Sequence, residues 1–240
     1  MKELFNDAIY QPLYNALTFL ISIVPFGDVG MAVILLTIVV KVLILPLSNK
    51  ALISQVRMRE IEPEVRKLKE KYGDNREELA KRTLELYREK KINPFSGCLP
   101  LLIQLPILMG LYFVFFKESG AVINPDLLYS FIHVPDPVTY HFLGLIDISQ
   151  KSLILALLAG FAQYIHTKMS LQAPAPRSGD GKVSFSDEFA RSMHIQMKYV
   201  FPIMITGIAF ITSGVIALYF IVSSVFAIAH ELVMKRTRTT

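Results

Sequence analysis

Lys41 is the residue of this sequence whose position most clearly points to chemistry. It lies within Val29 to Leu47, a run of nineteen residues in which the only other polar residue is Thr37. A lysine at the centre of a bilayer costs roughly 2.5–3.5 kcal/mol on insertion scales, so it needs water, a counter-charge or a polar partner. Two interpretations follow. Either Lys41 is a functional cation in a wet environment, or it snorkels to the membrane surface, six residues or about 9 Å further along the helix.

The other polar residues of the apolar stretches share helix faces. Thr37, Lys41 and Ser48 are spaced four and seven residues apart, so they form one stripe. Further polar residues occur in the later stretches, namely Gln104, then Gln163, His166 and Ser170, then Thr206 and Ser213. Taken singly, each is explained by hydrogen bonding between helices, typically worth less than about 1–2 kcal/mol. Together with a lysine that needs water, they indicate several helices that turn polar faces toward one cavity.

The chemistry that these residues offer is electrostatic and not catalytic. The sequence contains no phosphate-binding loop, no cluster with metal-ligand spacing and no nucleophile beside a base. We therefore expect no catalytic residues, no metal and no small-molecule cofactor. The single Cys98 cannot form an intrachain disulfide, and we interpret it as a packing residue.

The elements that must position these residues are membrane-spanning helices. Of the 240 residues, 52% are hydrophobic, and three more stretches have the length that a span needs: Leu99 to Phe116, Ser152 to Met169 and Tyr199 to Ala229. The last would be about 46 Å long as one helix, whereas the hydrocarbon core is about 30 Å thick. We therefore predict a break near Thr212-Ser213-Gly214 and an all-α polytopic membrane protein with five transmembrane helices. We find no signal or transit peptide and expect the N-terminus to be mature.

Basic residues predict the orientation of the chain. Thirteen lie between Lys50 and Lys91 and none between Glu118 and Gln150, whereas five flank the loop after the third span and three are in the tail. Because basic residues gather on the cytoplasmic side, the N-terminus is predicted outside and the C-terminus in the cytoplasm.

The expected order of elements follows from these spans and loops. It is an N-terminal interfacial helix (1–27), the first transmembrane helix (28–48), a cytoplasmic helical hairpin (49–92), the second transmembrane helix (93–117), an outside loop (118–145), the third transmembrane helix (146–169), a cytoplasmic loop (170–195), the fourth (196–212) and fifth (213–233) transmembrane helices and a cytoplasmic tail (234–240).

The N-terminal segment is amphipathic. Between Leu4 and Ile23 the apolar residues fall mainly on one helical face, and the polar ones fall mostly on the other: Asn6, Asp7, Gln11 and Asn15. This pattern predicts an interfacial helix that Pro25 and Gly27 end. A sixth span is the competing interpretation, which the polar residues disfavour.

The cytoplasmic segment predicts an antiparallel helical hairpin. Apolar seams over Ile61 to Tyr72 and Leu79 to Leu86 flank a break at Gly73-Asp74-Asn75, Asn75 and Glu78 can form a capping box, and Pro63 should kink or restart the first helix. Its basic residues include Arg57, Arg59, Arg66, Lys67, Lys81 and Arg82. They form either an ordinary solvated face, because acidic residues interleave with them, or a platform for anionic lipid head groups or ribosomal RNA.

Several motifs resemble the YidC/Oxa/Alb family of membrane protein insertases. They are Ile34 to Lys41 leading to Leu45-Pro46-Leu47, then Lys91 to Pro106 (KINPFSGCLPLLIQLP) with Gly110-Leu-Tyr112, then Phe142-Leu-Gly144, Gln163-Tyr164 and Met197 to Pro202 (MKYVFP). The resemblance extends from Tyr10 to about His230 with its spacing preserved.

The resemblance implies five helices around a hydrophilic groove that is open to the cytoplasm and to lipid. Lys41 stands where the family usually has a groove arginine, Gln163 matches a groove glutamine, Gln104 falls in the signature, and Phe220 stands where a tryptophan is often found. Together with Thr37, these are our predicted groove residues. The groove would receive hydrophilic segments of newly made membrane proteins in a bacterial plasma membrane.

The implied partners are those substrate proteins and the lipid bilayer, with the ribosome and the Sec translocon as further candidates. Two other classes stay open from the residues alone. A secondary transporter or channel would also bury a lysine, although it usually shows paired repeats, which we do not find here. A membrane assembly scaffold that does not insert proteins would need only packing and the hairpin.

Overall fold

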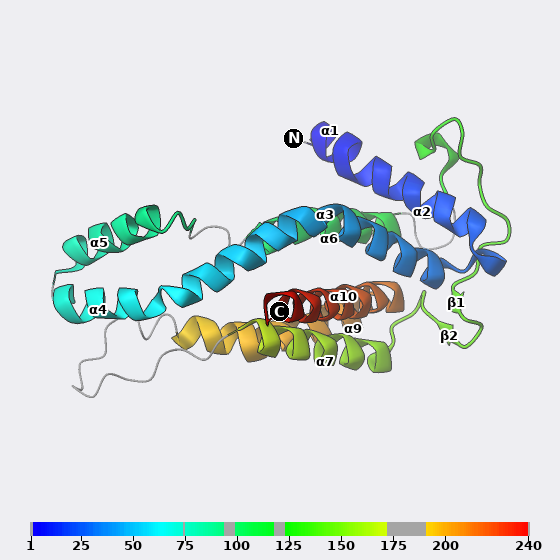
Figure 1. Cartoon of the computed structure of the whole chain (residues 1–240). Coiled ribbons are helices and arrows are strands. Elements are labelled where there is room, and N and C mark those ends of the chain that lie inside the picture. The colour runs from blue at the N-terminus through cyan, green and yellow to red at the C-terminus, as the bar shows by residue number, and fades with distance from the viewer. Residues whose placement is uncertain (1, 74, 94–98, 118–122, 172–190, 240) are drawn as a thin grey trace. The chain divides into compact units, whose positions relative to one another are not determined.

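The computed structural model describes residues 2–73, 75–93, 99–117, 123–171 and 191–239, and these are mainly helical (Figure 1). The chain divides into two compact units, Met1–Val42 with Pro106–Thr240, and Leu43–Leu105. The prediction of an all-α membrane protein is confirmed. The proposed Cys98 packing residue, together with Asp74, lies outside the described residues.

The elements of the first unit, in chain order, are α1 (Lys2–Phe5), η1 (Asn6–Tyr10), α2 (Gln11–Ile23), η2 (Pro25–Gly27), the beginning of α3 (Val29–Glu60), most of α6 (Leu99–Lys117), η4 (Pro125–Leu127), β1 (His141–Phe142), β2 (Ile146–Asp147), α7 (Leu153–Ser170), η5 (Gln196–Val200), α9 (Phe201–Ile211) and α10 (Gly214–Thr239). The second unit contains the rest of α3, then α4 (Glu62–Tyr72), α5 (Arg76–Glu89) and the beginning of α6.

Three helical segments of the described residues are long and apolar enough to cross a membrane: Val29–Met58, Arg191–Ile211 and Gly214–Arg236. A shorter apolar helix covers Gln104–Val114. The count of five spans stays a prediction. So do the ends of each span, because α3 continues as a helix past residue 48, and helix bounds do not locate a membrane surface.

The predicted break between the last two spans is confirmed. Helix α9 ends at Ile211, Thr212 has φ −90° and ψ −106°, and α10 begins at Gly214. A Cβ on Gly214 would lie 2.9 Å from the Cα of Ile148, so only glycine permits this approach. The N–H groups of Gly214 and Val215 donate to the carbonyls of Gln150 (2.8 Å) and Ile148 (3.1 Å). The segment before α7 thus satisfies the first donors of α10, which have no partner within their own helix.

Helices α7, α9 and α10 pack side by side in the first unit (Figure 1). Fully buried alanines lie along their contacts, namely Ala156, Ala159, Ala209 and Ala217. A Cβ on Gly160 would clash with the Thr206 hydroxyl of α9. Small residues therefore let these backbones approach closely, which is how helices associate where lipid removes the hydrophobic driving force.

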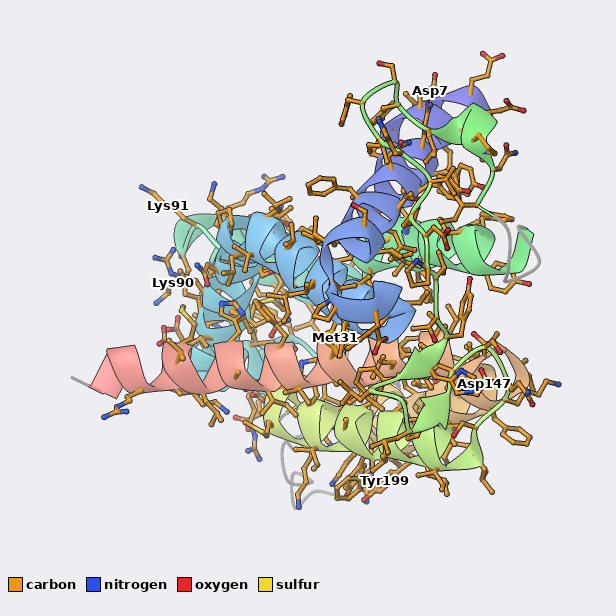
Figure 2. All side chains as sticks on the ribbon, turned by 90° about the vertical axis from the view of Figure 1, so that its right-hand side faces the viewer. Asp7, Met31, Lys90, Lys91, Asp147 and Tyr199 are labelled. Atoms are coloured by element: carbon orange, nitrogen blue, oxygen red, sulfur yellow. The ribbon has the colours of Figure 1, made fainter. Side chains whose placement is uncertain are left out.

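The N-terminal helix forms as predicted and ends before Pro25, but one polar residue was placed on the wrong face. Asn15 is only 1% exposed. Its amide donates to the carbonyl of Leu127 (2.9 Å) and accepts from the N–H of Tyr129 (2.7 Å), and the Tyr14 hydroxyl accepts from the N–H of Asn124 (2.7 Å). The helix is thus fastened to the segment 124–129, which runs beside the helix that carries Asp7 (Figure 2).

The second unit contains the predicted helical hairpin. Helix α3 ends at Glu60 and α4 restarts with Pro63 in its first turn, because proline needs no hydrogen-bond acceptor there. Ile61 and Leu86 are buried in a cluster against which Val65 and Leu68 pack. The Asn75 side chain caps α5 by accepting from the N–H of Glu78 (3.1 Å). A salt bridge between Lys90, the residue that follows α5, and Glu64 of α4 (2.8 Å) joins the two helices.

Candidate functional site

Lys41 lies on α3 in the first unit with its side chain partly buried. It is close enough to His166 of α7 for the two groups to interact electrostatically. Thr37, one turn earlier on α3, is 3% exposed, and its hydroxyl donates to the carbonyl of Val33 (2.7 Å). Thr37 therefore donates its hydroxyl hydrogen to its own helix and not to a group on another helix.

Gln163 links α7 to α10. Its amide nitrogen donates to the hydroxyl of Thr167 (3.1 Å), and its amide oxygen accepts from the hydroxyl of Ser224 (3.0 Å). Thr167 is 7% and Ser224 is 3% exposed, so these bonds lie inside the helix contact. Gln163 was predicted from its face and from the family motif, and the structure shows it as a hydrogen-bonded link between helices.

A second polar group joins the same two helices near their C-terminal ends. Glu231 of α10 is 5% exposed, and its carboxylate accepts from the Ser170 hydroxyl (2.5 Å) and forms a salt bridge with Lys235 (2.8 Å). The Lys235 amine also donates to the carbonyl of Met169 (3.4 Å). The charge of the Glu231 carboxylate also acts on the His166 imidazole, and its effect is larger than that of the Lys41 charge.

We call this set of side chains the polar seam, and its members are Gln163, His166, Thr167 and Ser170 of α7 with Ser224, Glu231 and Lys235 of α10. Sequence reasoning found Gln163, His166 and Ser170 but missed the α10 residues. A signal was present, because Ser224 and Glu231 are seven residues apart and share a helix face within an apolar stretch.

The two other predicted groove residues lie elsewhere. Phe220 of α10 is 5% exposed within the hydrophobic core, with its ring centroid 5.5 Å from that of Tyr219. Gln104 belongs to the other unit, Leu43–Leu105. A substrate-facing role for either residue stays a prediction.

The basic residues of the hairpin divide into paired and exposed ones. Arg82 forms salt bridges with Glu78 (2.9 Å) and Glu85 (3.1 Å), and the hydrogen bond to Glu78 followed by the charge of Glu85 raises the pKa of its guanidinium. Arg66 lies 3.6 Å from Glu70. Both pairs have the spacing of helix-surface ion pairs, which favours the solvated-face interpretation for these two residues. The other predicted residues are Arg57, Lys67 and Lys81, which are exposed, and Arg59, whose side chain is outside the described set.

Asp28 anchors the beginning of α3, thirteen residues before Lys41. It is 4% exposed, and its two carboxylate oxygens accept from the N–H of Met31 (3.1 Å) and from the N–H of Leu143 (2.8 Å). One side chain thus caps the helix that carries Lys41 and holds the β1–β2 hairpin against its end. Within the described residues, no group of three or more His, Cys, Asp and Glu side chains is arranged to hold a metal ion.

Comparison with known proteins places the chain in a family. Residues 8–240 match the family described as 60Kd inner membrane protein. This chain belongs to that family. The assignment confirms the resemblance that the motifs indicated.

Individual relatives share the name "Membrane protein insertase YidC". The one from Fusobacterium nucleatum is 32% identical over 234 residues, which cover 95% of this chain and 98% of that protein. The one from Ruegeria sp. is 33% identical over 242 residues, or 95% of this chain and 36% of the relative. The one from Dinoroseobacter shibae is 33% identical over 222 residues, or 88% of this chain and 34% of the relative. The chain therefore spans about a third of the two longer relatives.

Proposed function

We propose that this chain is a membrane protein insertase. The observation that carries the proposal is the match to the Fusobacterium nucleatum insertase, because it covers 95% of this chain and 98% of that protein. The family match over residues 8–240 and the apolar helices support the same function.

In the proposed mechanism, Lys41 receives the hydrophilic or acidic part of a substrate while the apolar part of the substrate enters the lipid. Each leucine or isoleucine at the centre of a span contributes about −0.3 to −0.6 kcal/mol, whereas one buried acidic residue costs about 2.5–3.5 kcal/mol. Substrate hydrophobicity therefore supplies the free energy of insertion. The cation lowers the barrier for the polar segment, and no bond of the substrate is made or broken.

The proximity of Lys41 to His166 supports a site shared between α3 and α7. Gln163 takes part by holding α7 against α10 through Ser224. Thr37, one turn before Lys41 on α3, is a further proposed groove residue. For Gln104 and Phe220 the proposal rests on the sequence motifs alone. The exposed basic residues of the hairpin are the proposed contacts for substrate or for its delivery partners, the ribosome and the Sec translocon.

The proposed setting is a bacterial plasma membrane with the hairpin in the cytoplasm and the N-terminus outside. Single cysteines in a Cys98→Ser background at Glu77 and His133, both exposed, test the orientation. An impermeant thiol reagent should label position 77 only from the cytoplasmic side and position 133 only from the outside. Labelling of both from one side would contradict the five-span arrangement.

Reconstitution into liposomes tests the function itself. An insertase should move a single-span substrate with a short acidic tail into the membrane, so that its tail becomes protected from added protease. A transporter or channel should instead carry solutes, and a scaffold should do neither. Solute flux without protection of the tail would refute the proposal.

A further inference from the structure

The β1–β2 hairpin of the first unit ends in an apolar tip. His141 pairs with Asp147 and Phe142 with Ile146, which leaves Leu143-Gly144-Leu145 as the loop. Leu143 is 59% and Leu145 is 82% exposed. A Cβ on Gly144 would meet nothing within 4 Å, so the tip projects away from the rest of the described chain. Loops of this kind usually consist of Gly, Asn, Asp, Pro and Ser, so two exposed leucines require a reason.

The backbone of the tip is held in place. The N–H of Leu143 donates to Asp28, and Leu143 has φ +52°, a left-handed conformation that is uncommon for a leucine. Phe142 packs against Gly30 at the beginning of α3. A Cβ on Gly30 would clash with the Phe142 ring. The hairpin therefore packs the partly buried Phe142 against the beginning of α3 and leaves its two leucines exposed.

The base of the hairpin is polar. The Asp147 carboxylate accepts from the N–H (2.9 Å) and the hydroxyl (2.6 Å) of Ser149 and from the side-chain amide of Gln150 (3.1 Å). Asp147 lies beside the start of α7 in Figure 2. The hairpin is therefore amphipathic, with an apolar tip and a base whose polar groups are hydrogen-bonded to one another. Such an element suits the boundary between water and hydrocarbon.

The position of the hairpin along the helices indicates which partner covers its apolar tip. The hairpin lies beside the beginnings of α3 and α7 (Figure 1), so it is level with the end of the membrane-spanning helices. Leu153 and Ile154, in the first turn of α7, are 56% and 70% exposed and continue the apolar surface toward the membrane centre. No basic residue lies between 118 and 150, and the first is Lys151, so attraction to lipid phosphates is not what would bring the tip to the membrane.

We propose that Leu143 and Leu145 insert into the interfacial region of the lipid leaflet at this end of the helices. The partner is a lipid surface, recognised through burial of apolar side chains and not through charge. The tip would fix the depth of the beginnings of α3 and α7, and through Asp28 it would fix the helix that carries Lys41. This inference depends on the chain being a membrane protein and not on its proposed insertase function.

The chain contains no tryptophan, so Leu145→Trp introduces a single fluorescent reporter. The variant is reconstituted into phosphatidylcholine vesicles with bromine atoms on the upper or the lower part of the acyl chains. His133→Trp, at an exposed position before the hairpin, is the matched control. We expect blue-shifted emission for Leu145→Trp, and a loss of fluorescence that is greatest with the upper bromines. The control should show neither a blue shift nor quenching. Added anionic lipid should not change the result for either variant.

Three outcomes would overturn the proposal. Emission without a blue shift and without quenching from Leu145→Trp would leave the tip in water. A blue shift without quenching by bromolipid would place it against protein, either a second copy or another partner. Quenching that appears only with anionic lipid would mean charge-driven binding. If Leu145→Trp accumulates poorly, a nitroxide on Leu145→Cys in a Cys98→Ser background gives the same decision from its accessibility to oxygen and to a water-soluble nickel complex.

Discussion

Replacing Lys41 with leucine distinguishes a groove cation from a snorkelling side chain. If Lys41 faces lipid, the change exchanges a cost of about 2.5–3.5 kcal/mol for a gain of about 0.3–0.6 kcal/mol, so the span should be stabilised by about 3–4 kcal/mol. At 1.4 kcal/mol per factor of ten, that raises the folding equilibrium constant by roughly two to three orders of magnitude. Unfolding in mixed detergent micelles measures this quantity.

The structure favours a different result, because Lys41 is partly buried and interacts with His166. We expect Lys41→Leu to stabilise the protein by well under 3 kcal/mol and to slow insertion of a substrate with an acidic tail. A charge pair at 4 Å near a protein surface is worth at most about 4 kcal/mol, so a loss of about ten- to one-hundredfold is the expected scale. Lys41→Arg should preserve insertion, and Lys41→Glu should be the most impaired variant.

Protease protection of the substrate tail in proteoliposomes gives the rate. Lys151→Leu, at an exposed position just before α7 and outside both the hairpin and the proposed groove, is the matched control and should leave the rate unchanged. Full activity of Lys41→Leu on the acidic substrate, together with the stabilisation of 3–4 kcal/mol, would refute the groove role and leave Lys41 as a snorkelling residue.

Three further predictions concern contacts seen in the structure. A double-mutant cycle with Gln163→Leu and Ser224→Ala should give a coupling free energy of about 0.6–1.7 kcal/mol in detergent unfolding, the range for hydrogen bonds between membrane helices. Asn15→Ala leaves the carbonyl of Leu127 and the N–H of Tyr129 without this partner, so the free energy of unfolding should fall by about 2–6 kcal/mol at about 1–3 kcal/mol for each of the two groups. Replacing both Leu68 and Leu86 with Asp should open the hairpin to proteolysis and weaken substrate crosslinking, while the apolar helices stay folded in detergent.

Matched variants serve as controls for these three predictions. Ser22→Ala, whose hydroxyl donates to its own helix at an exposed position, should show no coupling to Gln163→Leu. Asn6→Ala removes a half-buried amide near the N-terminus, whose bond to the Asp7 carboxylate is exposed, and should leave stability within about 0.5 kcal/mol. An equal loss at Asn15 and Asn6 would contradict the burial argument. Leu84→Asp, on an exposed part of α5, should leave the hairpin closed. Normal insertion by the variant with both hairpin replacements would show that the hairpin is dispensable.

Local features were predictable from the sequence because their causes are local. The break at residues 212–214 follows from a stretch too long for one crossing, and the restart at Pro63 follows from a residue without an N–H group. The hairpin follows from two apolar seams around a glycine, and Asn75 caps α5 because its side chain reaches an N–H group three residues on. In each case the interacting groups are at most a few residues apart, so spacing alone identifies them.

The partners of the polar side chains were decided by the tertiary structure. Asn15 was assigned to the polar face because its neighbours are polar, yet its partner is the carbonyl of Leu127, 112 residues away, and not water. Gln163 was identified from the sequence as a polar residue in an apolar stretch, but its bond to Ser224, 61 residues away, depends on how α7 packs on α10. Hydropathy and periodicity show that a polar group in an apolar helix needs a partner, because its desolvation is costly. Only the packing of the helices determines which group that partner is.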